Sequence, residues 1–292
     1  MDRRPRTVDR ERKMRETLKE AIRELEAAGC ETPRLDAEVL LAHALGCERH
    51  EIYLGPGTRD QGLGTEKKFK LFEDYIERRK NREPAAYITG TKEFWSLPIK
   101  VTPDVLIPRP ETETLVNAAL EKVPGPWSLV PGPFILDLCT GSGCVAAALA
   151  KELPDARFVV SDISPRALTV ARGNLKFAEG RVAFIQSDLF ENITGPFDLI
   201  VSNPPYVASK DWEGLQPEIK NFEPRLALDG GTDGLDFIRK ILQDAPRCLK
   251  SNGWLILENG SEIKTWNALS LKVKNPFTEK SKSAEPRTPS SL

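Results

Sequence analysis

Short apolar runs alternate with amphipathic stretches through the second half of the chain. Each run is four to six residues long and ends at small or polar residues, and the stretches between the runs repeat apolar positions at helical spacing. Apolar runs of this length predict strands that are buried on both faces of a sheet. The runs cover residues 134–138, 158–161, 182–186, 197–202 and 253–258, and the helical stretches cover 144–153, 164–177 and 234–249. This alternation predicts an α/β domain with a doubly wound, mainly parallel sheet.

The preceding part of the chain has apolar residues every three or four positions, which predicts helices over residues 14–28, 33–45 and 65–83. Gly29 and Gly46 follow the first two helices, where left-handed C-caps are typical. A β-hairpin is predicted next, because aromatic and β-branched residues gather around a glycine. The sequence therefore divides into a helical domain at 1–84, a β-hairpin linker at 85–106, an α/β domain at 107–260 and a C-terminal segment at 261–292.

The balance of charge narrows the choice of partner. The chain carries 42 Lys and Arg against 43 Asp and Glu, a formal net charge of -1. Residues 1–90 are balanced in the same way, with 19 basic and 18 acidic side chains. A surface built to hold the nucleic-acid backbone needs an excess of cations. We therefore expect no direct nucleic-acid binding, and we interpret the helical domain as a substrate-docking unit.

Cysteine and histidine usage argues against a metal site. The five cysteines are odd in number, scattered and never spaced C-x2-C, so they predict reduced thiols in a cytoplasmic protein. His43 and His50 have no metal-spaced partner. No stretch approaches the roughly twenty apolar residues of a membrane span, and the Arg-rich residues 1–15 lack the apolar core of a signal peptide. We expect neither a metal nor a membrane partner.

The motif Asn203-Pro204-Pro205-Tyr206 directly follows the apolar run 197–202. The carboxyl end of a strand is where open α/β sheets bind ligands. Two prolines fix the backbone and remove N–H donors, so the loop offers acceptors: the Asn203 side-chain oxygen and backbone carbonyls. Such a site suits a planar –NH2 group, whose two hydrogens need two acceptors and whose flat body can stack on Tyr206.

A second candidate loop, Cys139-Thr140-Gly141-Ser142-Gly143, follows the first apolar run. Its glycines let a ligand approach backbone N–H groups closely. Asp162 follows Gly143 by 19 residues, where an acid would bind the hydroxyls of a ribose. Because Gly141, Gly143 and Ala146 also satisfy the dinucleotide fingerprint, a nicotinamide dehydrogenase is the first rival interpretation.

Two further acids favour S-adenosylmethionine over a dinucleotide. Asp137 lies on the strand just before the glycine loop, where a carboxylate could hold an α-ammonium group but would repel a pyrophosphate. Asp188 follows the predicted strand at 182–186, where an adenine amine could be bound. Acids on successive strand ends, together with the loop at 203–206, predict a site for this cofactor.

Arg109 stands between two prolines in the segment Ile107-Pro108-Arg109-Pro110-Glu111-Thr112-Glu113. The prolines present its guanidinium rigidly, so it is well placed to reach a carboxylate, and we include it among the cofactor-binding residues. Glu111 and Glu113 fall in the first turn of the helix that Pro110 begins, where acids offset the helix dipole.

These motifs together resemble the release factor glutamine methyltransferases, which methylate N5 of the glutamine in the Gly-Gly-Gln motif of class 1 peptide chain release factors. The Asn-Pro-Pro-Tyr motif alone is shared with N6-adenine DNA methyltransferases, and the Ile-Pro-Arg-Pro-Glu segment makes the resemblance more specific. The resemblance runs from about Leu35 to Glu258 and includes Glu83-Pro84-Ala85-Ala86-Tyr87-Ile88-Thr89-Gly90, Phe94, Asp137-Leu138-Cys139-Thr140-Gly141-Ser142-Gly143 and Glu223-Pro224-Arg225-Leu226-Ala227-Leu228.

The resemblance implies a Rossmann-like class I S-adenosylmethionine-dependent methyltransferase domain after the helical domain and the hairpin linker. It also implies that residues 139–143 form the cofactor loop, that Asp162 holds the ribose, and that Asn203 contacts both cofactor and substrate. The catalytic residues would be Asn203, Pro204, Pro205 and Tyr206, which receive the glutamine. The partner would be a class 1 peptide chain release factor, and we expect a monomer.

The chain departs from the family pattern in three places. Cys139 replaces the usual first glycine of the cofactor loop, which is acceptable if its φ is negative. Leu189 stands where some members have a tryptophan beside the adenine, so we expect an apolar contact there. Residues 261–292 are rich in Lys, Ser, Thr and Pro, which predicts a disordered tail in place of a helix and two antiparallel strands.

Two alternatives remain open at this point. An N6-adenine nucleic-acid methyltransferase could use the same Asn-Pro-Pro-Tyr motif. The altered C-terminus could also leave a binding module without turnover, because a sheet that lacks its last strands exposes an edge.

Overall fold

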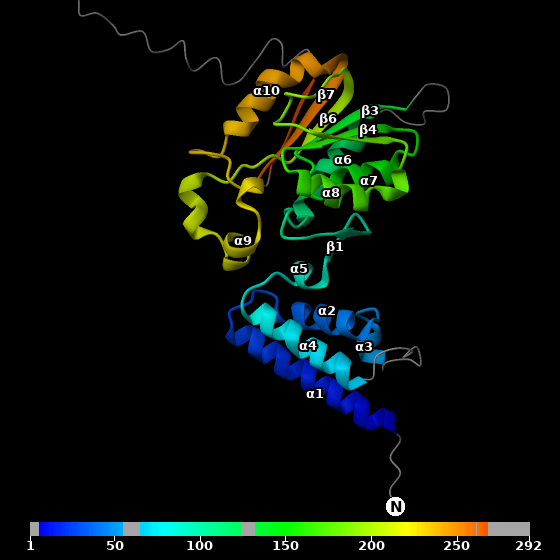
Figure 1. Ribbon diagram of the computed structural model, residues 1–292, viewed down its shortest axis with the longest axis vertical. Coiled ribbons are helices and arrows are strands. Elements are labelled where there is room, and N and C mark those ends of the chain that lie inside the picture. Colours follow the sequence, from blue (N-terminus) through cyan, green and yellow to red (C-terminus); the bar gives the residue numbers. More distant parts are fainter. Residues whose placement is uncertain (1–5, 55–64, 124–131, 261, 268–292) are drawn as a thin grey trace, which may run out of the picture. The chain divides into compact units, whose positions relative to one another are not determined.

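The computed structural model describes residues 6–54, 65–123, 132–260 and 262–267 (Figure 1). The chain forms two compact units, which we name by their content. The helical unit consists of Met1–Thr91 and Gln216–Phe222, and the α/β unit consists of Lys92–Leu215 and Glu223–Leu292. The sequence pattern instead predicts a boundary at residue 84 and assigns residues 216–222 to the α/β domain.

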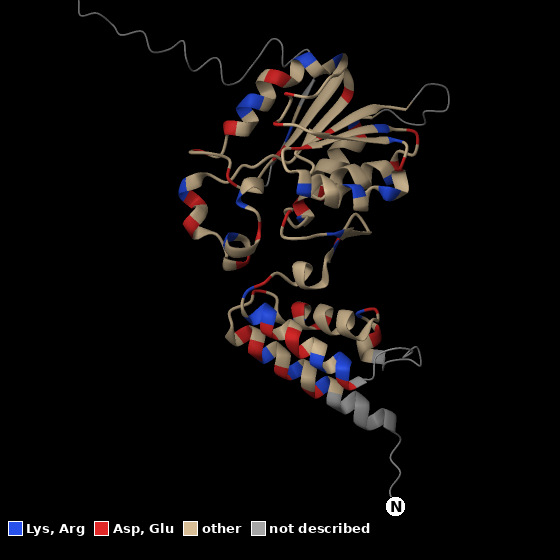
Figure 2. Ribbon diagram, viewed as in Figure 1, with Lys and Arg blue, Asp and Glu red and all other residues tan. Residues whose placement is uncertain are grey.

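The three predicted helices of the N-terminal part are present in the helical unit. Gly46 has a φ of 69° at the end of α2, so it forms the predicted left-handed cap. Leu25, Leu40 and Phe72 are almost fully buried in the core between the helices. On α4 and on the described part of α1, basic and acidic side chains are interspersed (Figure 2). The helices of this unit are α1 Arg6–Ala27, α2 Pro33–Leu45, α3 Glu51–Leu54, α4 Thr65–Lys80, α5 Ala85–Thr89 and α9 Pro217–Phe222.

A buried ion-pair network fixes α9 within the helical unit. The Arg79 guanidinium donates to Asp36 and to Glu218, each at 2.8 Å, and Arg82 makes two further bonds to Glu218. Arg79 is only 5% exposed. A buried charge needs such partners, because an isolated one is strongly unfavourable. The side-chain chemistry thus explains why residues from far along the chain complete this unit.

The predicted linker is a helix followed by a hairpin. Residues 85–89 form α5, which ends at Gly90 with a φ of 72°, so the prediction of β-structure from residue 85 is wrong for this part. The hairpin itself is confirmed, with β1 Thr91–Phe94 and β2 Leu97–Lys100. Trp95 and Ser96 form its turn with positive φ values, a conformation that matches the twist of the strands.

The α/β unit contains a six-stranded sheet with the order β5-β4-β3-β6-β7-β8. Every neighbouring pair is parallel except β7 and β8. The strands are β3 Phe134–Leu138, β4 Arg157–Asp162, β5 Val182–Gln186, β6 Phe197–Ser202, β7 Leu249–Asn259 and β8 Glu262–Asn267. The five strands predicted from the apolar runs are therefore confirmed, and so is the doubly wound parallel sheet.

Helices cover both faces of this sheet, with α6, α7 and α8 on one face and α10 on the other (Figure 1). Leu136, Ile200 and Leu255 are fully buried and share a core with Ile241 of α10. Strands that are buried on both faces explain why the apolar runs show little alternation. The helices are α6 Glu113–Lys122, α7 Cys144–Glu152, α8 Pro165–Asn174 and α10 Asp236–Cys248, and the 3₁₀ turns are η1 Pro110–Thr112, η2 Lys176–Ala178, η3 Ser209–Gly214 and η4 Arg225–Ala227.

The C-terminal segment contributes a strand. Residues 262–267 form β8, which pairs antiparallel with β7 from Trp254 to Asn259. The prediction of a disordered tail is therefore wrong for residues 262–267, because β-pairing along an open edge outweighs a polar composition. The rest of the predicted tail, residue 261 and residues 268–292, lies outside the described residues. Residues 1–5 lie outside them as well.

Candidate active site

Strand order places the two predicted loops at one point of the sheet. From β3 the chain continues to β4 and β5 on one side, and it then crosses to β6 on the other side of β3. Ligands of open α/β sheets bind at such a switch in direction, at the carboxyl ends of the strands. Leu138 at the end of β3 is paired with Ser202 at the end of β6, and the Ser202 hydroxyl donates to the Leu138 carbonyl at 2.6 Å. Cys139 and Asn203 therefore start their loops side by side.

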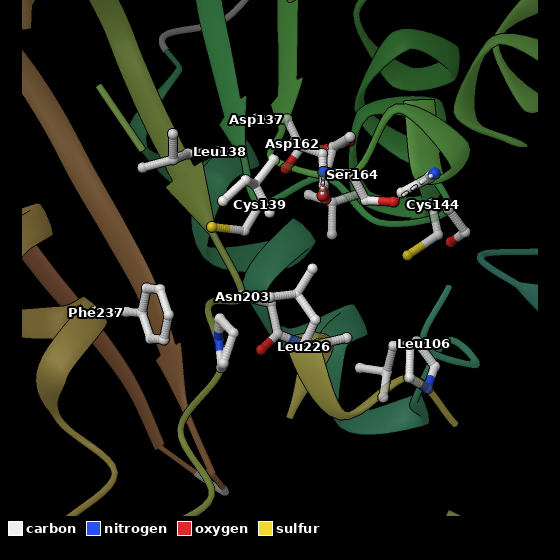
Figure 3. Close-up of a pocket in the computed structure, with 18 of the residues that line it drawn as sticks. Leu106, Asp137, Leu138, Cys139, Cys144, Asp162, Ser164, Asn203, Leu226 and Phe237 are labelled. Atoms are coloured by element: carbon white, nitrogen blue, oxygen red, sulfur yellow. Dashed lines mark hydrogen bonds between the residues drawn. The ribbon is translucent and has the colours of Figure 1, made fainter. Parts of the chain in front are cut away.

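A cavity of about 350 Å³ opens at these strand ends (Figure 3). Its size is within the range of small-molecule sites. The predicted site residues that line it are Arg109, Asp137, Cys139, Thr140, Ser142, Asp162, Asp188, Leu189, Asn203 and Pro205. The structure thus gathers most of the predicted cofactor-binding residues around a single cavity.

The remaining predicted residues of the two loops, Gly141, Gly143, Pro204 and Tyr206, are not among the described residues that line the cavity. Gly141 donates its backbone N–H to the Asp162 carboxylate at 2.9 Å. Gly143 has a φ of 77°, and an added Cβ would lie 3.0 Å from Ala171 of α8. These glycines therefore shape the loop and allow the close packing of α7 against α8.

Asp137 is buried at the base of the cavity, with 2% of its surface exposed. One carboxyl oxygen accepts from the Thr140 hydroxyl at 2.7 Å and from the Ala146 N–H at 3.2 Å. Burial raises the pKa of Asp137 to about 7, although these two donors oppose the shift. A cation placed beside this carboxyl would restore the charged form, as expected for a group that binds an ammonium.

Asp162 ends β4 beside the glycine loop. Its two carboxyl oxygens accept from the backbone N–H groups of Gly141 and Ser164, each at 2.9 Å. Burial raises the pKa of Asp162, and the backbone donors work in the opposite direction. Each carboxylate oxygen can accept more than one hydrogen bond, so Asp162 can still receive hydroxyl donors from a ribose.

Cys139 has a φ of 60°, so the expectation of a negative φ at this position is wrong. The loop needs a left-handed residue here, because the chain must turn directly from β3 into the glycine turn. An L-residue with a side chain is strained in this conformation, which explains why the family pattern has glycine. Burial also raises the pKa of the Cys139 thiol, so the thiol stays protonated.

Leu189 lies 7% exposed in the cavity wall with a φ of 45°. The turn is held by Ser187, whose hydroxyl donates to the Leu189 carbonyl at 2.8 Å and accepts from the Asn192 N–H at 3.0 Å. Asp188 lines the same wall. The side chains at 188 and 189 therefore offer an acceptor and an apolar surface next to each other.

The loop at 203–206 packs tightly on the segment at 230–234. An added Cβ on Gly234 would lie 2.3 Å from the Tyr206 carbonyl, and one on Gly230 would lie 2.7 Å from the Tyr206 Cα. Val207 continues this packing through a parallel bridge to Asp229. The loop is therefore held by backbone contacts as well as by its prolines.

The Asn203 side chain contacts Thr112, and its Nδ2 donates to the Thr112 hydroxyl at 3.2 Å. This bond leaves Oδ1 as the acceptor of the amide. Tyr206 is half-buried, and burial raises the pKa of its hydroxyl. The loop thus presents an acceptor to the cavity next to a neutral aromatic side chain.

Arg109 lines the cavity, but its guanidinium already has a carboxylate partner. Its Nη2 donates to Glu223, which also accepts from the Ile107 N–H at 3.2 Å. Burial raises the pKa of Glu223, and Arg109 counters the shift. The sequence predicts a carboxylate partner for Arg109, and Glu223 of the protein itself is one such partner.

Other lining residues are absent from the sequence-based prediction. Leu106 and Leu226 lie at the lower part of the view in Figure 3, and Phe237 lies at its side. Leu226 belongs to the Glu-Pro-Arg-Leu-Ala-Leu motif, so a signal was present. Phe237 is the second residue of α10, and a helix pattern alone gives no signal for a cavity wall.

Within the described residues, no group of three or more His, Cys, Asp and Glu side chains could hold a metal ion. None of the helices in the described ranges is both long enough and apolar enough to cross a membrane.

Two family models match the chain. The PrmC N-terminal domain matches residues 16–90, and the methyltransferase small domain matches residues 128–218. Three relatives, each named release factor glutamine methyltransferase, are similar over most of the chain. They come from Geobacter sulfurreducens (45% identity, 80% of this chain and 78% of the relative), Rhodopirellula baltica (43%, 79% and 78%) and Koribacter versatilis (41%, 86% and 87%).

Proposed function

The chain belongs to the release factor glutamine methyltransferase family, and from this membership we propose how its site works. It is an S-adenosylmethionine-dependent methyltransferase that acts on a glutamine of release factors. We assign the reaction to the cavity between β3 and β6. The acceptor is N5 of the glutamine in the Gly-Gly-Gln motif of class 1 peptide chain release factors.

One observation supports this assignment more than any other. The paired strand ends at Leu138 and Ser202 set the glycine loop at 139–143 and the acceptor loop at 203–206 side by side. A methyl donor held by the first loop would therefore lie next to a substrate held by the second. Transfer between two bound molecules requires this proximity above all.

The residues around the cavity fit S-adenosylmethionine. The Asp137 carboxylate suits its α-ammonium, the Asp162 carboxylate suits its ribose hydroxyls, and the wall at Asp188 and Leu189 suits its adenine. Arg109 would complete the set through guanidinium N–H groups that do not bond Glu223, because arginine carries five donors. When bound, the cofactor supplies an electrophilic methyl group on a positively charged sulfur.

The acceptor loop compensates for a weak nucleophile. The lone pair of an amide nitrogen is delocalised into the carbonyl, so rate enhancement depends on orientation. Asn203 Oδ1 and the Pro204 carbonyl each accept one hydrogen of the glutamine –NH2 group. These two bonds hold the nitrogen in line for transfer and stabilise the positive charge that grows on it.

No general base is required before transfer. Methylation makes the remaining hydrogens of the nitrogen acidic, so a proton leaves afterwards. Pro205 and Tyr206 form the apolar and aromatic side of the acceptor loop and exclude water from the nitrogen. The four residues at 203–206 therefore act as one catalytic unit.

Replacing Asn203 tests the assignment. Asn203→Ala should lower the rate of methyl transfer to a release factor by roughly 10²–10³-fold, because the growing charge loses a stabilising acceptor. Binding of S-adenosylmethionine, followed by calorimetry, should change little. Asn203→Asp keeps an acceptor and should retain more activity than the alanine variant. Asn117→Ala is a matched control, because the Asn117 amide bonds only the Glu113 carbonyl of its own helix among the described residues.

Assays on a release factor, on DNA and on RNA in parallel separate the remaining interpretations. We propose that only the release factor is methylated and that the protein works as a monomer without direct nucleic-acid binding. Methylation of DNA or RNA adenine would instead favour the N6-adenine alternative. Retention of full activity by Asn203→Ala would remove the acceptor loop from the mechanism.

We propose a docking role for the helical unit. Its balanced surface charge suits a protein partner better than a polyanion. Leu35 and Tyr53 are unusually exposed apolar side chains on this unit, at 43% and 48%. The KM for an intact release factor should therefore be lower than the KM for a short Gly-Gly-Gln peptide, with a similar kcat.

A further inference from the structure

Glu258 is a buried carboxyl near the end of β7. It is 1% exposed, and neither of its carboxyl oxygens has a hydrogen-bond partner in the part of the chain that the structure describes. A buried polar group without a partner is unfavourable, and more so if it is charged. The position of this side chain therefore calls for a role other than stability.

Strand register places Glu258 beside the acceptor loop. Strands β6 and β7 are parallel neighbours, and Ser202 is paired with Leu257 (Figure 1). The residues that follow this pair, Asn203 and Glu258, are therefore adjacent at the strand ends. Thr112 of η1 completes the group, because its hydroxyl accepts from Asn203 Nδ2 at 3.2 Å. Thr112 and Asn203 both lower the pKa of Glu258, so both favour its charged form.

The chemistry of these three groups bears on how Asn203 is oriented. The two ends of an asparagine amide have the same shape, but only Oδ1 accepts a hydrogen bond and only Nδ2 donates one. A threonine hydroxyl can do both, so Thr112 alone does not distinguish the two orientations. A carboxylate accepts only. With the Glu258 carboxylate next to Asn203 at the strand ends, the amide is more stable with Nδ2 toward Thr112 and the carboxylate and with Oδ1 toward the cavity.

We propose that Glu258 is a positioning residue that acts through Thr112 and Asn203 to keep Oδ1 of Asn203 turned toward the substrate amide. The inference rests on the proposed function of the acceptor loop. Glu258 itself touches neither the cofactor nor the substrate. Its role is to exclude the flipped amide, which would present donors to the hydrogens of the glutamine –NH2 group.

The charge of Glu258 is central to this role, and several groups act on it. Burial raises the pKa of Glu258, and Glu111 of the same segment as Thr112 raises it further, whereas Thr112 and Asn203 lower it. Burial and then the Glu258 carboxylate raise the pKa of the Tyr206 hydroxyl. A protonated Glu258 gains a donor and loses its preference for one amide orientation. Activity should therefore decline on the acidic side as this carboxyl is protonated.

The variant Glu258→Gln tests the proposal, since it keeps the shape of the side chain and adds donors. We expect kcat for release-factor methylation to fall by about 10–100-fold, as for other residues that orient a catalytic group, while the Kd for S-adenosylmethionine stays within about 2-fold. The acidic limb of the kcat profile should also disappear. Ser161→Ala, which alters another buried side chain without a described partner, on strand β4 of the same sheet, should leave kcat unchanged.

A double-mutant cycle distinguishes positioning from a merely structural role. In an Asn203→Ala background, Glu258→Gln should lower kcat by less than about 2-fold, because the group it orients is gone. Thr112→Val should resemble Glu258→Gln, and Thr112→Ser should restore activity. These threonine variants also test the proposal if Glu258→Gln fails to fold in urea titrations.

Three outcomes would overturn the inference. They are equal effects of Glu258→Gln in the two backgrounds, an acidic limb that persists in Glu258→Gln, and full activity of Thr112→Val. If Asn203→Ala itself keeps full activity, the proposed function of the loop fails first. If Asn203→Ala is inactive and Glu258→Gln is fully active, only the role of Glu258 fails.

Discussion

The glycine loop at 139–143 and the acceptor loop at 203–206 begin beside each other on paired strands, yet they are held in opposite ways. The glycine loop bends through positive φ values at Cys139, Gly141 and Gly143, and it directs a backbone N–H to Asp162. The acceptor loop has two prolines and rests against glycines of another segment. The glycines of the first loop are part of that loop. The glycines beside the second loop, Gly230 and Gly234, belong to the segment on which it packs.

This difference follows from what each loop has to offer a ligand. A loop of glycines exposes N–H donors and lets a large ligand approach the backbone. A loop of prolines exposes carbonyl acceptors and keeps them at fixed positions. The comparison predicts that changes near the first loop alter cofactor binding, whereas changes near the second alter the rate of transfer.

Among substitutions outside the acceptor loop itself, the largest effect is expected from Gly234→Ala. A Cβ at this position would meet the Tyr206 carbonyl at 2.3 Å, and the φ of 79° adds strain. The acceptor loop should shift, and kcat should fall by about 10²-fold, because small displacements of positioning groups are costly. Steady-state kinetics with a release factor would measure this effect.

The control for that variant is Gly214→Ala, where an added Cβ meets nothing within 4 Å. Cofactor affinity should be close to wild type in both variants. A loss of S-adenosylmethionine binding in Gly234→Ala as large as its loss of turnover would break the comparison between the loops.

A pH-dependent effect on stability is expected from Asp137→Asn. The folded pKa of about 7 lies above the usual aspartate pKa of 3.8, so the protonated carboxyl is favoured in the folded state. This contribution is complete below about pH 4 and is lost as the pH rises through 7. Relative to Asp137→Asn, the wild-type free energy of unfolding should fall by roughly 2–4 kcal/mol between these values.

Urea unfolding at a series of pH values would measure this change. S-adenosylmethionine should reduce it, because an ammonium beside Asp137 favours the charged carboxylate. If the free energy of unfolding changed with pH in the same way for wild type and Asp137→Asn, the pKa of Asp137 would not be raised in the folded state.

A smaller effect, on affinity, is expected from Asp162→Ala. Two backbone donors and the ribose hydroxyls lose a shared acceptor, so binding of S-adenosylmethionine should weaken by about 1–3 kcal/mol in calorimetric titration. At saturating cofactor, kcat should remain near wild type. A kcat loss comparable to that of Asn203→Ala would mean that the two loops do not divide binding from transfer.

The smallest effect is expected from Cys139→Gly, which relieves the strain of a φ of 60°. Glycine at this position should raise the free energy of unfolding by about 1 kcal/mol relative to Cys139→Ala, since both variants lack the thiol and differ in their tolerance of positive φ. Thermal unfolding of the two variants would show the difference. Equal stabilities would argue that the loop relaxes to negative φ.

Much of the α/β unit could be predicted because its signals are local. The apolar runs gave the five strands, and the strand-end acids Asp137 and Asp162 gave two walls of the cavity. The φ of Cys139 could not be read in this way, since it depends on how the chain leaves β3. The sequence pattern does not predict strand β8, because its composition is polar and the strand is stabilised by its pairing with β7.

The residues around the acceptor loop show a second limit. Thr112 and Gly234 lie far from Asn203 in the sequence, and each meets the acceptor loop through contacts made only in the fold. Glu258 has no motif of its own that predicts burial without a partner. Sequence patterns identified the residues of the loop, whereas its supports required the structure.

Helix α9 has a consequence for the order of events during protein synthesis. Glu218 lies 139 positions after Arg79, so the ribosome makes the cations of the helical unit long before their anion. At roughly 5–20 residues per second, the interval is on the order of ten seconds. During this time Arg79 has only Asp36 as a carboxylate partner and Arg82 lacks Glu218, so the network is completed only after most of the α/β unit has been translated. The helical unit, most of which is translated first, therefore completes its ion-pair network late in synthesis.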